Sequence, residues 1–156
     1  MTEDARFEDG REAPLNLGAM DAEDLSVISA LVQDAVFPVT EMTWRASERR
    51  FALLLNRFRW EDKGRERHGA ERVQSVLAVD NVLRVSSQGI SRDDKDMILS
   101  LLALTWMPGD DAEGVLELVL AGDGAIRLTV EALEVTLKDV TRPYRARSKR
   151  EPGHPA

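Results

Sequence analysis

The chain has 156 residues, a formal net charge of −7 and no cysteine. The lack of cysteine excludes disulfides, thiolate metal sites and a cysteine nucleophile, and the negative charge disfavours nonspecific binding to a phosphate backbone. The length suits a single domain. The acidic start has no apolar core of a secretory signal, and no apolar run is long enough to cross a membrane. We therefore expect a cytoplasmic protein with no membrane contact.

Both ends of the chain are predicted to be flexible. Residues 1–14 are charged and poor in apolar side chains, which predicts a disordered acidic tail. Residues 142–156 begin with the basic run "RPYRARSKR" and are predicted to form a flexible basic tail. A nucleic-acid-binding arm is the alternative for this run, but a solvated tail is favoured. Residues 15–141 form the predicted domain.

One helix is predicted, at residues 21–33. Asp21 is a suitable N-cap, and Asp24 would lie three residues later, near the positive end of the helix dipole. Leu25 and Ile28 belong to a single apolar stripe at helical spacing. A helix with one apolar face is expected to pack against a sheet.

A β-hairpin is predicted to follow the helix. Its strands cover about 36–45 and 49–60, with a turn near residues 46–48, and Pro38 indicates an edge strand or the first residues of one. The next segment is a polar loop that contains His68. This histidine is expected to be solvated, because no histidine or cysteine stands at metal-ligand spacing from it.

Two stretches of the chain resemble each other. Residues 76–90, "VLAVDNVLRVSSQGI", align without a gap with residues 119–133, "VLAGDGAIRLTVEAL". Each stretch contains a turn signal, Asp-Asn in the first and Asp-Gly in the second, and each is predicted to form a hairpin. Both have an arginine at the equivalent position, Arg84 and Arg127, which the expected register points away from the core.

The similarity extends upstream. Residues 97–106, "MILSLLALTW", resemble "FALLLNRFRW", with Trp106 matching Trp60. Hydrophobic alternation does not require the shared tryptophan, aspartate and arginine, so we favour an internal duplication with halves at about 51–90 and 97–133. Convergence of two hairpins is the alternative. The match favours a strand at 97–106, although "SRDDKD" before it contains a helix-start signal.

The apolar pattern of the second hairpin predicts its register. A three-residue loop at 122–124 places six apolar side chains on one face, namely Leu116, Leu118, Leu120, Ile126, Leu128 and Val130. Gly124 and Asn81 are the expected left-handed residues of the two loops. The same register in the first copy pairs Leu77 with Leu83, and Glu117 lies within reach of Arg127.

The alternation changes phase at residues 131–132, which predicts a β-bulge that bends one long strand over 125–138. The elements together predict an α+β fold. It is dominated by an antiparallel twisted sheet or a partly closed barrel, with one N-terminal helix and the internal duplication.

No catalytic signature is present. The chain lacks a P-loop, a dinucleotide-binding motif, a nucleophile elbow and a metal-binding pair. The stretch "GDDAEG" at 109–114 lacks the spaced oxygen ligands of a calcium loop and is interpreted as a hairpin loop. We therefore expect no cofactor and no metal, and favour a protein that is not an enzyme.

The candidate binding residues lie where the two copies differ. Asn56, Arg57 and Arg59 stand where the second copy has less polar residues, and Asn56 shares its phase with Leu54, Phe58 and Trp60, which we take to be the core-facing phase. A buried amide needs hydrogen-bond partners. The favoured interpretation is structural: the amide of Asn56 belongs to a β-bulge or holds a neighbouring loop. Alternatively, Asn56, Arg57, Arg59 and Trp60 line a polar pocket or partner surface.

The segments "SVISALVQDAVFPV" and "RRFALLLNRFRWE", followed by "RVQSVLAVDNV", resemble a family of small alphaproteobacterial proteins, domain of unknown function 2948. The resemblance covers about residues 17–147. The family has no assigned activity, so no catalytic residues carry over. The hypothesis we favour is a non-catalytic protein-interaction module that binds a second copy or another protein. The alternative is a small-molecule-binding protein or an enzyme with an unrecognised site.

Overall fold

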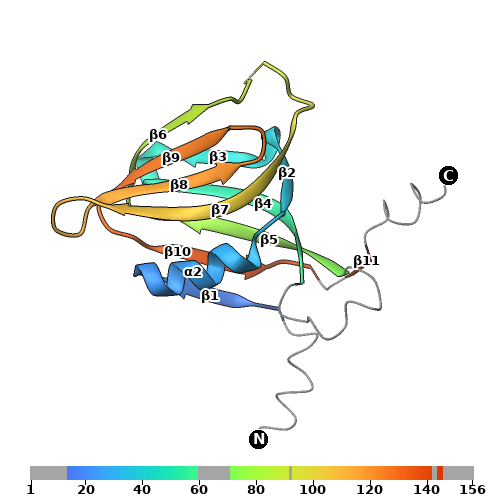
Figure 1. Cartoon of the computed structure of the whole chain (residues 1–156), viewed down its shortest axis with the longest axis horizontal. Coiled ribbons are helices and arrows are strands. Elements are labelled where there is room, and N and C mark those ends of the chain that lie inside the picture. Colours follow the sequence, from blue (N-terminus) through green and yellow to red (C-terminus); the bar gives the residue numbers. More distant parts are fainter. Residues whose placement is uncertain (1–13, 60–70, 92, 142–143, 146–156) are drawn as a thin grey trace, which may run out of the picture.

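The computed structural model describes residues 14–59, 71–91, 93–141 and 144–145. The loop with His68 and the two predicted tails lie outside these ranges, except for residue 14 and for residues 144–145, which form a short strand paired with residues 71–72. The described chain forms an 11-stranded sheet with one α-helix (Figure 1), and every strand pairing is antiparallel. The elements are β1 (Asn16–Ala19), α2 (Ala22–Leu31), β2 (Val36–Pro38), β3 (Met42–Arg45), β4 (Arg50–Phe58), β5 (Glu71–Val79), β6 (Val82–Gln88), β7 (Ile98–Pro108), β8 (Gly114–Leu120), β9 (Ala125–Val130), β10 (Val135–Asp139) and β11 (Tyr144–Arg145).

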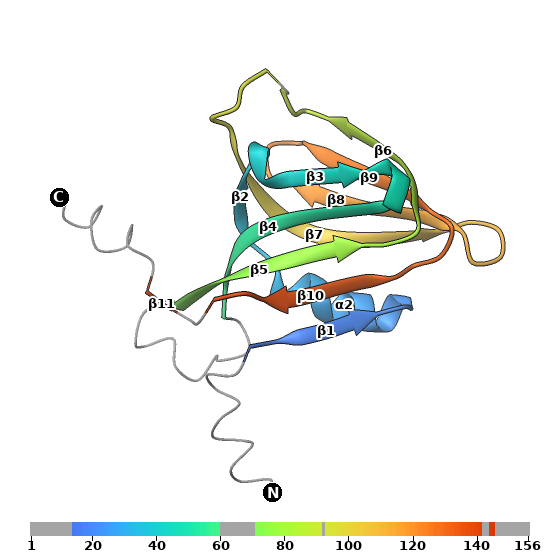
Figure 2. The same cartoon turned by 180° about the vertical axis from the view of Figure 1, so that it is seen from behind.

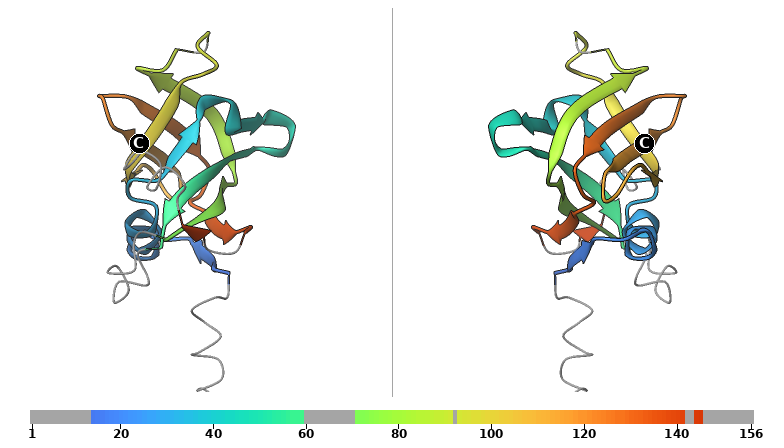
Figure 3. Two further views of the ribbon diagram at one scale, coloured as in Figure 1. Left: turned by 90° about the vertical axis from the view of Figure 1, so that its right-hand side faces the viewer. Right: turned by 90° about the vertical axis from the view of Figure 1, so that its left-hand side faces the viewer.

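The strands follow the order β1-β10-β5-β4-β2-β7-β8-β9-β6, with β3 added beside β4 and β11 beside β5. The sheet curls around the apolar core (Figures 2 and 3) but does not close, because β1 and β6 are the two ends of this order. The predicted α+β class and antiparallel sheet are confirmed. No helix in the described ranges is long and apolar enough to cross a membrane.

The helix α2 is confirmed close to its predicted bounds. The side chain of Asp21 accepts a hydrogen bond of 2.8 Å from the backbone N–H of Asp24, so one free donor of the first turn is satisfied. Leu25 and Ile28 are buried, and the helix packs on β7 and β1. The helix therefore packs across both β1, at one end of the strand order, and β7, in its middle.

The predicted hairpin is confirmed at β3 and β4, which are joined by a short 3-10 helix at Ala46–Glu48. The single strand expected at 36–45 is wrong, because another 3-10 turn, Val39–Glu41, divides it into β2 and β3. Pro38 does not lie on an edge strand. It ends β2, where it pairs with Ile98 of β7, and β2 itself connects β4 to β7.

The second of the two similar stretches forms the β8–β9 hairpin. Its register pairs Leu118 with Ile126 and so differs by two residues from the prediction. The loop is closed by a 2.9 Å hydrogen bond from the N–H of Leu120 to the carbonyl of Gly124. The left-handed residues are Gly122 and Asp123, not Gly124. A shift of two preserves the side-chain faces, so the six predicted apolar residues are all buried.

The first of the two similar stretches does not form a hairpin, which corrects the predicted pairing of Leu77 with Leu83. β5 pairs with β4 and β10, whereas β6 pairs with β9 on the other side of the sheet. Asn81, between them, does adopt the predicted left-handed conformation, with φ of 63°. The two stretches thus differ in pairing, and the internal duplication stays a prediction.

The strands also decide three further predictions, on residues 97–106, on residues 125–138 and on the two arginines. Residues 98–108 form β7, so the strand is correct, and residues 93–96 before it form turns. The change of phase at 131–132 ends β9, and the next strand, β10, pairs with β5 rather than continuing beside β8. A single bulged strand at 125–138 is therefore wrong. Arg84 and Arg127 are exposed, as predicted.

Candidate functional site

The predicted binding residues on β4 point to opposite sides of the sheet. The buried residues of this strand are Phe51, Leu53, Leu55 and Arg57, while Asn56 and Phe58 are only half-buried. The phase assigned to Asn56 is therefore wrong, and Arg57 is the residue that points into the interior. A strand alternates its faces, so Asn56 and Arg57 cannot line one face of the sheet together.

Arg57 has no exposed surface and lies in a buried polar cluster with Asp139 and Ser75. Its Nη2 is 3.0 Å from each carboxylate oxygen of Asp139, and its Nε donates to Ser75 Oγ at 3.0 Å. Ser75 Oγ in turn donates to Asp139 Oδ1 at 2.6 Å, and the N–H of Leu15 donates to Oδ2 at 2.9 Å. The cluster therefore connects β4, β5, β10 and the residue before β1.

Asn56 lies on the half-buried face of β4, and Asn56 and Arg59 both interact with residues of β5. The backbone carbonyl of Asn56 accepts a 3.1 Å hydrogen bond from Arg72, whose guanidinium lies 4.0 Å from the ring centroid of Phe58. Arg59 pairs with Glu71 at 2.9 Å. Trp60 lies outside the described residues. These contacts join neighbouring strands, and a ligand-binding role for the four residues stays a prediction.

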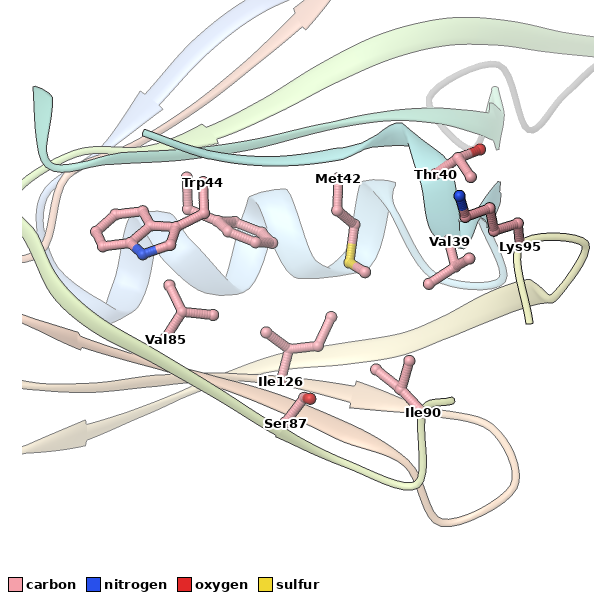
Figure 4. A pocket seen from close by; sticks show the side chains of 10 residues that line it. Val39, Thr40, Met42, Trp44, Val85, Ser87, Ile90, Lys95 and Ile126 are labelled. Atoms are coloured by element: carbon pink, nitrogen blue, oxygen red, sulfur yellow. The ribbon is translucent and has the colours of Figure 1, made fainter. Parts of the chain in front are cut away.

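A pocket of about 360 Å³ lies in the gap between β3 and β6, and we call it the β3–β6 pocket. Among the strands of the described ranges, β3 pairs only with β4 and β6 only with β9, so each of the two has one edge at this gap that no described strand occupies. Met42 and Trp44 enter the pocket from β3, and Val85 and Ser87 enter it from β6 (Figure 4). Both strands thus contribute alternate residues to one cavity.

The floor and the ends of the β3–β6 pocket differ in polarity. Phe51 and Ile126, which are 3% and 1% exposed, belong to the core and also line the pocket. Thr40 and Lys95 lie together at one end, and Trp44 lies at the other (Figure 4). The remaining lining residues are Val39 and Ile90. The pocket is thus an opening into the apolar core with polar groups near one end.

The sequence contained a signal for this site that we did not use. Met42 and Trp44 alternate with polar residues in a short strand, and such alternation indicates a strand with one inward face. Their convergence with Val85 and Ser87 depends on the sheet order, which places residues more than forty positions apart on opposite walls. No cluster of three or more potential metal ligands occurs in the described ranges.

The matched family agrees with the resemblance noted in the sequence. Residues 15–154 match the family described as "Protein of unknown function (DUF2948)". The chain belongs to this family. The match includes the whole described domain, with the β3–β6 pocket and the Arg57 cluster. No curated protein matches the chain significantly, and neither does any solved structure.

Proposed function

We propose that this DUF2948 protein binds a small, largely apolar molecule in the β3–β6 pocket. The observation that carries the proposal is a pocket in the gap between two sheet edges, which reaches down to the buried core side chains Phe51 and Ile126. Ligand pockets are concave, mostly apolar and about 300–1,000 Å³ in volume. The volume of about 360 Å³ lies within this range.

The volume limits the size of the ligand. At roughly 30 Å³ for each water-sized group, the pocket holds on the order of a dozen non-hydrogen atoms. At about 0.3–0.5 kcal/mol per atom, such a ligand gains about 4–6 kcal/mol on binding. The expected dissociation constant therefore lies between about 1 mM and tens of micromolar.

A pocket-filling substitution tests the proposal. Val85 is half-buried on the β6 wall, so Val85→Phe places a ring in the cavity. Isothermal titration with decanamide, a neutral linear amide, is expected to show binding to the wild-type protein and at least about tenfold weaker binding to Val85→Phe.

Val27→Phe is the matched control, because Val27 is 52% exposed on α2 and does not line the pocket. It should bind decanamide like the wild type. Undiminished binding by a folded Val85→Phe variant would contradict the proposed site, and the absence of binding to the wild type would contradict the proposed function.

A second candidate, closer to the interaction module favoured by the sequence, is the addition of a strand from a second copy at β6. The specific observation is the free edge of this seven-residue strand, since unpaired backbone groups at an edge can pair with another chain. Hydrogen exchange of β6 amides should then slow as protein concentration rises, while that of β8, which is paired on both sides, should not change. A concentration-independent monomer contradicts this candidate.

A further inference from the structure

We infer that the β3–β6 pocket selects an acidic amphiphile, with its anionic group at Lys95 and its apolar chain directed toward Trp44. This inference rests on the proposed function and specifies the ligand class of the same site. It follows from the uneven distribution of polar groups along the cavity. Lys95 is the charged residue among those that line it, and it lies at the end opposite Trp44 (Figure 4).

The position of Lys95 suits a contact with the anionic group of the ligand. It is exposed and sits in the turn before β7, while its long side chain reaches the pocket beside Thr40. A lysine ammonium is a compact charge with three donors on a flexible stem, and it can follow a carboxylate without a fixed geometry. The Thr40 hydroxyl at the same end can donate one more hydrogen bond.

The ammonium of Lys95 is available to a ligand. No ion pair or hydrogen bond links its side chain to another described residue. Asp93, Asp94 and Asp96 flank it in the sequence and weaken the local positive potential, but none of them lines the pocket. Asp94 instead accepts a hydrogen bond from the backbone of Asp96. The charge that a bound ligand meets inside the cavity is therefore that of Lys95.

The rest of the pocket suits an alkyl or aryl body. Beyond the Lys95 end, the walls are formed by Met42, Val85 and Trp44 above the buried Phe51 and Ile126, and Ser87 contributes a single hydroxyl. A methionine side chain adapts to irregular apolar shapes, and an indole ring offers a flat apolar surface. A chain of about ten carbons with a terminal carboxylate matches both the capacity and the polarity of the cavity.

The test compares two ligands of the same size and different charge. Decanoate carries a carboxylate, and decanamide is its neutral counterpart. Wild-type protein is expected to bind decanoate about three- to tenfold more tightly than decanamide at low salt, and added salt should reduce this preference. Lys95→Met keeps the apolar stem and removes the charge, so it should bind the two ligands equally. Lys95→Arg should retain the preference.

Lys138→Met is the control variant, because Lys138 is exposed on β10 and does not line the pocket. It should keep the wild-type preference for decanoate. If wild type and Lys95→Met show the same ratio of the two dissociation constants, the acidic-ligand inference is overturned while the proposed function stands. If neither ligand binds to the wild type, both are overturned.

Discussion

Removing one partner of the buried Arg57–Asp139 ion pair should destabilise the fold strongly. The two side chains are 0% and 5% exposed, and they form two 3.0 Å contacts from Arg57 Nη2 to the carboxylate. Losing one partner leaves an uncompensated buried charge, which typically costs about 3–5 kcal/mol. We expect this loss in the free energy of unfolding for Arg57→Met and for Asp139→Asn. At about 2–4 °C per kcal/mol, the Tm should fall by about 6–20 °C.

The double variant Arg57→Met/Asp139→Leu tests whether the loss of stability comes from leaving one charge buried without a partner. Two apolar side chains leave no buried charge, so the double variant should cost clearly less than the sum of Arg57→Met and Asp139→Leu measured singly. The Ser75 hydroxyl would lose both partners in that variant and should account for about 1–3 kcal/mol of the remaining cost. Urea is the suitable denaturant, because guanidinium chloride would itself screen charge.

The matched control is the surface pair of Arg127 and Glu117, which are 3.2 Å apart and 44% and 20% exposed. Arg127→Met should cost less than about 1 kcal/mol, since solvent screens an exposed pair. The reasoning is refuted if Arg57→Met and Asp139→Asn each cost no more than Arg127→Met. That result would mean that water replaces the missing partner, so the cluster would not depend on direct pairing.

Three further substitutions test local features of the fold by urea unfolding. Gly114→Ala should destabilise by at least about 1 kcal/mol, because its Cβ would lie 2.6 Å from the Met107 carbonyl oxygen; wild-type stability would contradict this close approach. Asp21→Ala should cost about 0.5–2 kcal/mol by removing the cap on Asp24, and no loss would show that the cap is unimportant. Asn81→Gly should be tolerated better than Asn81→Ala, since φ is 63° there; the reverse order would contradict a conformational role.

The sequence predicted side-chain faces better than strand register. In β8, apolar residues alternate so regularly that the inward face follows directly, and Leu116, Leu118 and Leu120 are buried as expected. A shift of two residues leaves every side chain on the same face, so the apolar pattern alone could not distinguish Leu118–Ile126 from the pairing two residues away. The register depends on turn conformation, here with Gly122 and Asp123 left-handed.

The face of β4 was mispredicted because its pattern is ambiguous. Three consecutive leucines, residues 53–55, fit either phase, and a charged Arg57 argued against the interior. An arginine is buried when a partner compensates its charge. That partner, Asp139, is 82 residues away, and nothing local in the sequence indicates the pairing. The β3–β6 pocket was missed for the same reason, since its walls meet only through long-range sheet order.

The gap at the β3–β6 pocket is related to the pairing of β5. Asp80 and Asn81 carry the turn signal of a hairpin, yet β6 cannot pair with β5, because β4 and β10 already take both of its edges. β10 occupies one of these edges after β9 ends at Val130 and the alternation changes phase at residues 131–132. β6 is then left to pair with β9, opposite β3, and the two free edges face each other across the cavity. The pairing of β10 with β5 thus excludes the predicted β5–β6 hairpin and goes together with the gap that forms the proposed binding site.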